Sequence, residues 1–446
     1  MQRALALGLV LLASFGSLAL APQAPRAEAL FNGKDLSGWV AVNCAPSTFT
    51  VKDGEIRCTG KPTGVLRTAE RFRNFVLEME WMHEVPGGNA GLIIWSDPLP
   101  ARGQPFTRSI EVQVMLTDDV KDKEGRLLYT GHGDIFSIHG ATMVPDRPHP
   151  AGWARCLPSD RFTKGAGEWN HYKVTAKDGT LKLEVNGHPV SGGRDISPRE
   201  GFICLESEGT PVRFRNITLT RLPDDCMPLP PDQRCKPDEG FVPLFDGTLT
   251  GWREQPGKEG HWRAEDWRLA YDGRGDTLWS ERELGDFELI CDWRWSGTPT
   301  RTAVRVIRPD GSTPVGKDGK QEMVEIDDHG DSGIYLRGSD KSQVNIWCWP
   351  IGSGEVYGYR TDINQPPAVK QGVTPTEKAD APPGQWNRFR IRMQGDRLTV
   401  NLNGKTVIQD AQLPGVPRKG PLALQHHGAP IEFANIYVRE LPASGR

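Results

Sequence analysis

The chain has 446 residues with 54 basic and 57 acidic side chains, a formal net charge of -3, and is rich in Gly (50) and Pro (36). Because the charges nearly balance, the protein has no net positive potential that would attract a polyanion, so nucleic acid is not expected as a partner. A chain of this length usually folds into more than one domain, each with its own hydrophobic core. The glycine and proline content is typical of many strands joined by turns and is below the level that signals disorder.

Residues 1–29 are expected to be a signal peptide followed by a short N-terminal segment. Arg3 precedes an apolar stretch that ends at Leu20, and small residues follow where a peptidase would cut. A membrane anchor is the alternative, but the apolar stretch is near the lower length limit and Pro22 and Pro25 follow at once. We therefore expect an exported protein, periplasmic or extracellular, with no membrane association after cleavage.

Residues 30–222 and 241–442 are expected to be two copies of one domain. The first contains LFNGKDLSGW, EWN, VNG and FRNITL, and the second repeats the order as LFDGTLTGW, QWN, LNG and FANIYV. The offset between copies grows only from 214 residues at the opening phenylalanine to 219 at the closing one. Such a long, steady period indicates a duplicated domain rather than a solenoid. The Pro- and Asp-rich stretch 223–240 is the expected linker.

Apolar and polar residues alternate with a period of two wherever the pattern is readable, as in Phe75–Trp81, Leu181–Val185 and Arg388–Met393. Such alternation is typical of strands with one buried face. Asn-Gly pairs at 186–187 and 403–404 mark tight hairpin turns, and no long stretch with helical period competes. Each copy is therefore predicted to be an antiparallel β-sandwich of jelly-roll type, and the chain to be all-β.

The eight cysteines form an even set without the close CxxC spacing of zinc ribbons. In an exported protein, disulfides are the expected state. Free buried cysteines are the alternative, because sequence does not determine connectivity. The expected pairs are Cys44 with Cys58, Cys156 with Cys204, Cys291 with Cys348, and, across the linker, Cys226 with Cys235.

One strand of each copy carries polar side chains on a single face. In the first copy Glu111 and Gln113 alternate with apolar residues, and in the second Gln343, Asn345 and Trp347 do so. Ordinary solvated outer strands are the alternative. Because equivalent strands share this design, the sequence favours a concave site on each copy.

These segments resemble the 3-keto-disaccharide hydrolases, also described as 3-keto-glucoside 1,2-lyases. The resemblance includes the motifs above together with NAGLII and IEVQV in the first copy and DSGIYLRG and LALQHHG in the second. It implies a concanavalin A-like sandwich in each copy and cleavage of glycosides already oxidised at C3. It also implies an oligosaccharide or glycoside substrate and a 3-dehydrogenase that acts upstream.

The chemistry implied by the resemblance defines what a site should contain. A C3 ketone acidifies the C2 hydrogen, so a base can remove it and the enolate can expel the glycosidic oxygen from C1. Elimination needs a base, a donor or metal for the enolate oxygen, and an acid for the leaving group. The sequence does not identify a cofactor. A divalent cation is one candidate, but the sequence points to no residues as its ligands. Direct hydrolysis by two opposed carboxylates is the alternative reaction.

In the first copy Glu111 is the expected base, and Gln113 is expected to bind substrate hydroxyls. His132 and Asp134, in GHGDIF, are expected to be catalytic, because histidine titrates near neutrality and can carry a proton. A surface-loop histidine is the alternative for His132. Trp95 replaces the arginine of the family pattern. Further substrate contacts are expected from Trp95, Glu206 and Glu208.

In the second copy Gln343 replaces the carboxylate of the pattern and Asn345 the glutamine. An amide cannot act as a base near neutral pH. The second copy is therefore expected to bind a sugar without catalysis, unless His427, Glu325 or Asp327 acts as the base. The expected contacts are Tyr335 and Arg337 on one face, with Gln343, Asn345, Trp347 and His427. The acidic cluster at 325–331 is a candidate calcium site, but its irregular spacing favours a solvated turn.

Two function classes therefore stay open. The first is an exported enzyme acting on 3-keto-glycosides. The second is a lectin-like surface protein whose two halves bind glycans without chemistry, because one sandwich scaffold supports both.

Overall fold

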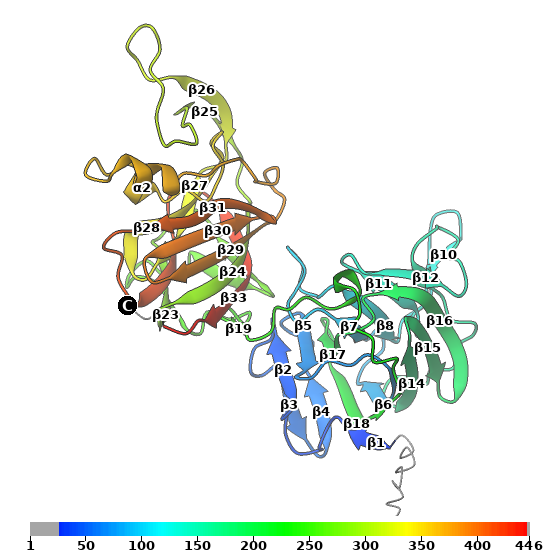
Figure 1. Ribbon diagram of the computed structural model, residues 1–446. Helices are drawn as coiled ribbons and strands as arrows, with labels where there is room; N and C mark the ends of the chain where they lie inside the picture. The colour runs from blue at the N-terminus through cyan, green and yellow to red at the C-terminus, as the bar shows by residue number, and fades with distance from the viewer. Residues whose placement is uncertain (1–25, 444–446) are drawn as a thin grey trace, which may run out of the picture.

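The computed structural model describes residues 26–443 and consists of two β-sandwich domains joined by one linker (Figure 1). The prediction of an all-β chain with two tandem concanavalin A-like sandwiches is confirmed. The predicted signal peptide lies almost wholly outside the described residues. Within residues 26–443, no helix has the length and apolar character needed to cross a membrane.

The first domain is formed by two antiparallel sheets and a small hairpin, β9 (Val120–Lys121) with β10 (Leu127–Tyr129). The nine-stranded sheet has the order β12 (Thr142–Pro145), β16 (His188–Ser197), β15 (Thr180–Val185), β14 (Asn170–Lys177), β6 (Phe75–His83), β18 (Val212–Arg221), β4 (Glu55–Cys58) and β3 (Phe49–Lys52), with β1 (Ala27–Ala29) beside β18. The seven-stranded sheet has the order β13 (Arg155–Cys156), β11 (Ile135–Ile138), β8 (Ser109–Met115), β7 (Asn89–Ser96), β17 (Phe202–Ser207), β5 (Gly64–Thr68) and β2 (Trp39–Val42).

The second domain has the same two-sheet arrangement, with fewer strands in each sheet. The eight-stranded sheet has the order β21 (Trp262–Glu265), β22 (Arg268–Tyr271), β33 (Ile431–Glu440), β24 (Phe287–Trp295), β29 (Asn387–Gln394), β30 (Arg397–Leu402) and β31 (Lys405–Gln412), with β19 (Val242–Pro243) beside β33. The five-stranded sheet has the order β20 (Trp252–Arg253), β23 (Leu278–Leu284), β32 (Gly420–Leu424), β27 (Asp331–Leu336) and β28 (Ser339–Trp347). Two short helices follow β28, α1 (Tyr357–Arg360) and α2 (Pro367–Gly372), and a 3-10 turn at Pro231–Gln233 lies in the linker.

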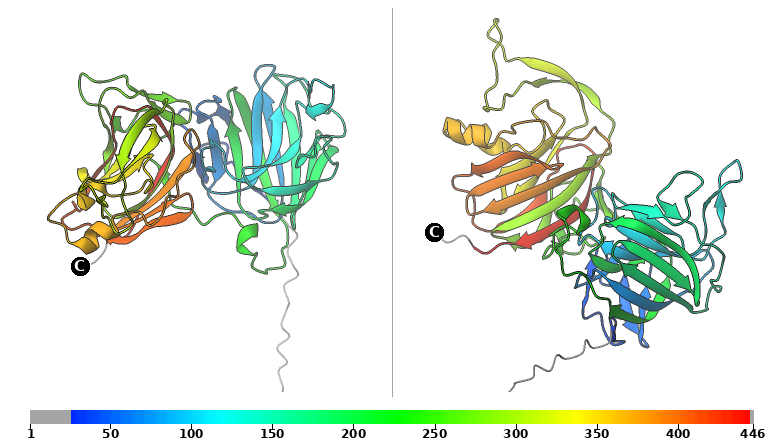
Figure 2. Two further views of the ribbon diagram at one scale, coloured as in Figure 1. Left: turned by 90° about the horizontal axis from the view of Figure 1, so that it is seen from above. Right: turned by 45° about the vertical axis from the view of Figure 1, so that its right-hand side comes forward.

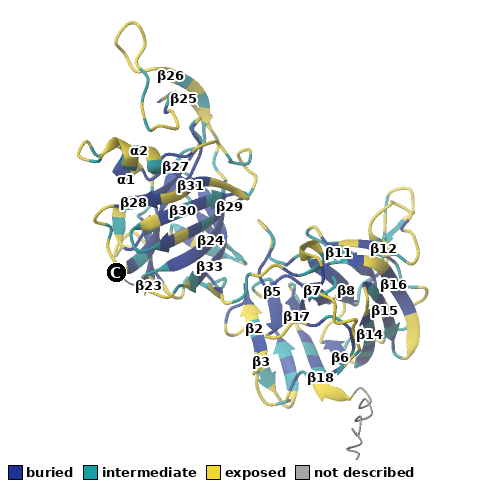
Figure 3. Ribbon diagram, viewed as in Figure 1, coloured by how far each residue is buried: buried dark blue, intermediate teal, exposed yellow. Residues whose placement is uncertain are grey.

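A long hairpin, β25 (Thr300–Arg305) with β26 (Met323–Asp328), projects from the second domain away from the first (Figures 1 and 2). Its side chains are mostly exposed, whereas the strands of both sandwiches are largely buried (Figure 3). The hairpin therefore contributes little to either core.

The predicted alternation of inward and outward side chains is confirmed. In β6, Leu77, Met79 and Trp81 are buried between the sheets while Glu78 is exposed. The predicted turn at residues 186–187 joins β15 to β16, and both of its residues have positive φ, 50° and 87°. Asn and Gly tolerate this backbone conformation best, which explains the hairpin.

The second domain packs on the outer face of the first domain's seven-stranded sheet. Val65, Ile93 and Cys204 of that face form one apolar cluster with Ile290 and Tyr437 of the second domain. The same cluster includes Phe202 and, from the linker region, Cys235 and Phe241. Burial of apolar surface on both partners fixes the two domains against each other.

The loop between β7 and β8 is also held by the second domain. The backbone nitrogen of Gly103 donates to Asp292 Oδ2 at 2.8 Å, and Asn435 Nδ2 donates to the carbonyl oxygens of Ala101 and Gln104 at 3.3 and 3.0 Å. This loop therefore depends on both halves of the chain for its conformation.

The predicted disulfides are wrong: all eight cysteines lie in the described part of the chain and all are free. Cys156 lies in β13 at one edge of the seven-stranded sheet, and Cys204 lies in β17, four strands away. At roughly 4.8 Å per strand the two are about 19 Å apart, far beyond the reach of a disulfide. Across the linker, Cys226 is exposed whereas Cys235 is buried in the interdomain cluster.

Candidate functional site

The uncovered part of the seven-stranded sheet forms a hollow in the first domain. Its volume is about 300 Å³, and β7, β8, β11 and β13 supply its floor. Glu111 and Gln113 lie side by side on this face, while Val112 and Val114 point into the core. The hollow is lined by Asn89, Phe106, Glu111, Gln113, Met115, Tyr129, Phe136, Ile138, His139, Arg155 and Glu208.

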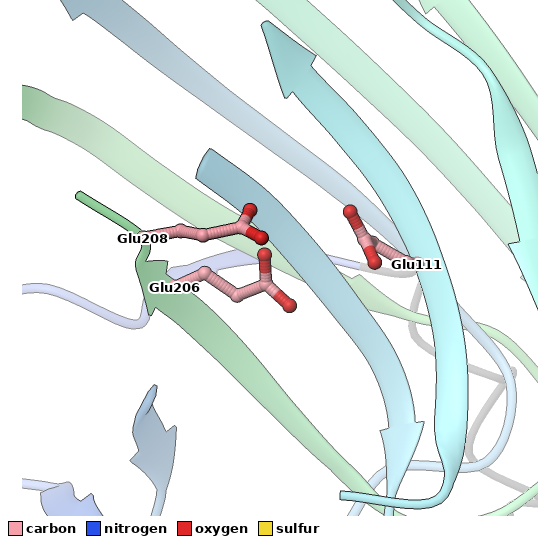
Figure 4. A group of neighbouring side chains, drawn as sticks. All are labelled: Glu111, Glu206 and Glu208. Carbon is pink, nitrogen blue, oxygen red and sulfur yellow. The ribbon is translucent and has the colours of Figure 1, made fainter. Parts of the chain in front are cut away.

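Three carboxylates converge at one side of the hollow (Figure 4). Glu111 projects from β8, Glu206 from β17, and Glu208 from the residues just after β17. One oxygen atom of each lies within 4.8 Å of the others. Glu206 is fully buried, and neither of its carboxylate oxygens has a hydrogen-bond partner.

Gly91, on the strand between β8 and β17, makes this convergence possible. A Cβ atom at this position would lie 2.3 Å from Glu206 Oε2 and 3.1 Å from Glu111 Cγ. Any larger residue would therefore push the carboxylates apart. The glycine is required here for space, because its φ is not in the left-handed region.

The three carboxyl groups have raised pKa values. Burial raises the pKa of Glu111, the charge of Glu208 raises it further, and Arg155 opposes the rise. Burial also raises the pKa of Glu206 well above its ordinary value, with contributions from Glu111 and Glu208. Burial raises the pKa of Glu208, opposed by a hydrogen bond with Asn89. Three negative charges in this space therefore require protons or a cation.

Arg155 links the hollow to the predicted catalytic residue Asp134. Its Nε lies 2.6 Å from Asp134 Oδ2, and its Nη2 donates to Gln113 Oε1 at 2.7 Å. Asp134 is completely buried and also accepts a hydrogen bond from Thr130 Oγ1. With these partners, Asp134 does not reach the hollow, and it positions Arg155 and, through it, Gln113.

Two further predicted residues lie outside the hollow. The ring of His132 is buried, with Nε2 3.3 Å from the carbonyl oxygen of Asp160. Trp95 is fully buried in the core, where its Nε1 donates to the carbonyl oxygen of Arg73 at 2.9 Å. The prediction that Trp95 contacts substrate therefore does not fit the structure. His139, at the end of β11, lines the hollow in place of His132.

The second domain carries a hollow of about 560 Å³ at the equivalent place on its five-stranded sheet. Tyr335, Gln343, Asn345, Trp347 and His427, all predicted from the sequence, lie together here. The rings of Trp347 and Trp349 stack at a centroid distance of 4.4 Å. The remaining lining residues are Asp331, Asp340, Lys341, Trp349, Tyr357, Gly358 and Gln425.

Arg337 does not join this hollow, so the prediction that it shares a face with Tyr335 is wrong. It is 2% exposed, pairs with Asp286 at 2.8 Å and donates to the carbonyl oxygen of Gly285 at 2.7 Å. The reason is a left-handed backbone, with a φ of 53° at Arg337 and 55° at Trp95, the matching position of the first domain. This conformation breaks strand alternation and turns the side chain elsewhere.

The acidic stretch at 325–331, a candidate calcium site in the sequence, does not bring three of its side chains to one point. Glu325 and Asp327 project from the β25–β26 hairpin and pair with Arg301 at 3.6 and 3.1 Å. Within residues 26–443, the three glutamates of the first domain are the only convergent group of potential metal ligands. Residues 325–328 lie in β26 and Asp331 begins β27, so a turn is confined to residues 329–330.

The two hollows correspond position by position. Gln113 N donates to the carbonyl oxygen of Asp134 at 2.9 Å, and Asn345 N donates to that of Glu355 at 2.8 Å. Glu355 pairs with Arg360 as Asp134 pairs with Arg155. By the same correspondence, the three glutamates are replaced by neutral side chains and a histidine: Gln343 for Glu111, Gln425 for Glu206 and His427 for Glu208.

Comparisons with known proteins agree with this duplication. A family model described as the 3-keto-alpha-glucoside-1,2-lyase-like domain matches residues 26–220 and 240–439. A 3-keto-disaccharide hydrolase of Bacteroides thetaiotaomicron is 25% identical over 46% of this chain and 82% of that protein.

Two solved structures are also similar. One, provisionally described as a glycosyl hydrolase from Parabacteroides distasonis, has 22% identity and a TM-score of 0.35, covering 44% of this chain and 94% of its own. The other, a β-glucanase of Bacillus licheniformis, has 13% identity and a TM-score of 0.28, covering 46% and 100%. Because the family model matches most of both halves, the chain belongs to the 3-keto-α-glucoside-1,2-lyase-like family and contains two copies of its domain.

Proposed function

We propose that the protein is an exported enzyme that cleaves the glycosidic bond of 3-keto-glycosides in the hollow of the first domain. The observation that carries the proposal is Glu111, a buried carboxylate with a raised pKa in a hollow that also contains a fixed amide and a guanidinium. Family membership and the 3-keto-disaccharide hydrolase relative support it.

Glu111 is the proposed base. It takes the C2 proton, and the electron pair of that bond forms the enolate with the C3 ketone. The enolate then collapses to a C1–C2 double bond as the bond from C1 to the glycosidic oxygen breaks. A base whose pKa lies closer to neutrality than that of an ordinary glutamate suits this step. Addition of water to the double bond gives net hydrolysis.

Two neighbours have supporting roles. Gln113 is held on both sides, by Arg155 at its Oε1 and by Asn89 at 3.2 Å from its Nε2, so it presents a rigid group to substrate hydroxyls. His139 lines the same hollow and is the proposed proton donor for the leaving oxygen. The substrate requires prior oxidation at C3, so a 3-dehydrogenase is the proposed upstream partner.

The second hollow is proposed to bind a saccharide without chemistry. The indole of Trp349 and the ring of Tyr335 supply flat apolar surfaces, and Gln343 and Gln425 supply amides. Gln343 Nε2 donates to Gln425 Oε1 at 2.6 Å, so the amides stand in a fixed arrangement. This hollow favours the lectin-like function for the second half of the chain.

The test is incubation of the purified full chain with 3-keto-trehalose or a 3-keto-glucoside and measurement of the released aglycone. Glu111→Gln is expected to lower turnover by about 100-fold or more, as is typical for loss of a general base. Glu325→Gln, the same substitution on the exposed hairpin, is the matched control. Unchanged substrate, with and without added divalent metals, would favour glycan binding by both halves instead.

A further inference from the structure

We propose that Glu111, Glu206 and Glu208 together bind one hard divalent cation. Their ligand oxygens lie within 4.8 Å of one another, a separation that one ion at ordinary metal–oxygen distances can span. The carboxylates approach from β8, from β17 and from the residues after β17, so they surround a common point rather than lying along one strand (Figure 4).

The environment of the Glu206 carboxylate indicates that a ligand binds there. Its side chain is completely buried and aimed at the other two carboxylates, and both of its oxygens lack a hydrogen-bond partner. Buried polar atoms nearly always have a partner, and a buried charge needs one most. The nearby guanidinium of Arg155 is already committed to Asp134 and Gln113.

The second domain provides an internal comparison. At the positions of Glu111 and Glu206 it has Gln343 and Gln425, which satisfy each other through a direct hydrogen bond of 2.6 Å. Amides carry donors and acceptors and can do this alone, whereas charged carboxylates carry acceptors only. The first domain therefore needs a third group between its side chains where the second does not.

The ligand set determines the class of ion. Three carboxylates without sulfur or imidazole suit Mg²⁺, Mn²⁺ or Ca²⁺ rather than zinc or copper. Three protein ligands also leave coordination positions open to water or to a ligand from the hollow, which Glu111 and Glu208 both line. One oxygen per carboxylate is sufficient for the ion.

The test is titration of the metal-free full chain with Mn²⁺, followed by electron paramagnetic resonance of the free ion and by elemental analysis. We expect one ion per chain, and a higher midpoint of thermal unfolding when the ion is in excess. Glu206→Gln should weaken binding by more than about tenfold, because loss of a direct ligand exceeds the effect of losing an outer contact. Glu325→Gln should bind as the parent does.

Glu206→Gln introduces the residue that the second domain has at this place, and circular dichroism checks its fold. Absence of saturable binding of Mn²⁺, Mg²⁺ and Ca²⁺ below about 1 mM would overturn the proposal and indicate that protons neutralise the cluster. Equal affinity in Glu206→Gln and the parent would overturn it as well. Because no substrate is present, the outcome does not depend on the proposed reaction.

Discussion

The hollows of the two domains have the same framework and different chemistry. Both have a glycine beneath the site, Gly91 and Gly333, where a Cβ atom would lie 2.3 Å from the side chain of Glu206 and of Gln343, respectively. Both also have a buried acid–arginine pair at one side. The first hollow, however, has three carboxylates where the second has two amides and a histidine.

This comparison separates positions that build the site from positions that act in it. Asp134 has a counterpart in Glu355, and the pair with arginine persists where the three carboxylates are absent. A feature present beside both the acidic and the neutral hollow is required by the framework. A feature confined to one of them is a candidate for chemistry, and Glu111, Glu206 and Glu208 meet that criterion.

The largest change in activity is expected when the first hollow is converted into the second. The triple variant Glu111→Gln, Glu206→Gln and Glu208→His should lower release of aglycone from a 3-keto-glucoside by about 100- to 10,000-fold, because it removes the proposed base. Saccharide binding, measured by calorimetry, should remain in the second hollow. Retention of most of the turnover would show that the difference between the hollows is not what makes one of them catalytic.

A smaller effect is expected from breaking the buried pairs that both domains share. Arg155→Ala leaves the carboxylate of Asp134 buried without its main partner, and Arg360→Ala does the same to Glu355. Each should lower the free energy of unfolding of its domain by about 3–5 kcal/mol. Urea denaturation followed by tryptophan fluorescence measures this loss.

The double variant Asp134→Asn with Arg155→Met is the control for this prediction, because it removes both charges. It should recover part of the lost stability. If Arg155→Ala unfolds like the parent while turnover collapses, Arg155 serves the site, directly or through Gln113, rather than the stability of the domain.

The smallest expected effect is a pH dependence of saccharide binding by the second hollow. Burial, together with the charge of Asp328, raises the pKa of Asp331 to about 7. Below that pH the carboxyl is neutral, and above it the charged form is the better acceptor for sugar hydroxyls. Binding should therefore strengthen as the pH rises through 7. Asp331 also lies 4.0 Å from the ring of His427.

Asp331→Asn should remove most of this dependence, since it keeps the shape and cannot ionise. The measurement is the dissociation constant of a saccharide for the full chain at several pH values on either side of 7. An unchanged pH profile in Asp331→Asn would show that Asp331 is not the titrating group.

Much of the architecture could be predicted from the sequence because the signals are local. Alternation within one strand places Glu111 and Gln113 on one face without knowledge of any other strand, and the Asn-Gly turn at 186–187 fixes its hairpin. The convergence of Glu206 on Glu111 could not be predicted from a local signal. It depends on β17 lying beside β7 and β7 beside β8, which is a property of sheet order and leaves no mark in a short segment.

Two further features of the fold also leave no signal in a short segment of sequence. A single left-handed residue at the end of a strand sends Trp95 and Arg337 away from the face that alternation assigns to them. Arg155 lies 42 residues after Gln113, so only the assembled sheet brings the two together. The cysteines suggested disulfides by their even number, whereas their separation across the sheets excludes the bridge between Cys156 and Cys204.

The loop between β7 and β8 connects the first hollow to the second domain. Phe106 on this loop forms part of the wall of the first hollow, while Gly103 a few residues earlier is bonded to Asp292 of the other half. A fragment that ended in the linker would keep all three glutamates yet lose the support beneath that wall. It would also expose Ile93 and Val65 to water, so the truncated first domain should aggregate and lose the shape of its hollow.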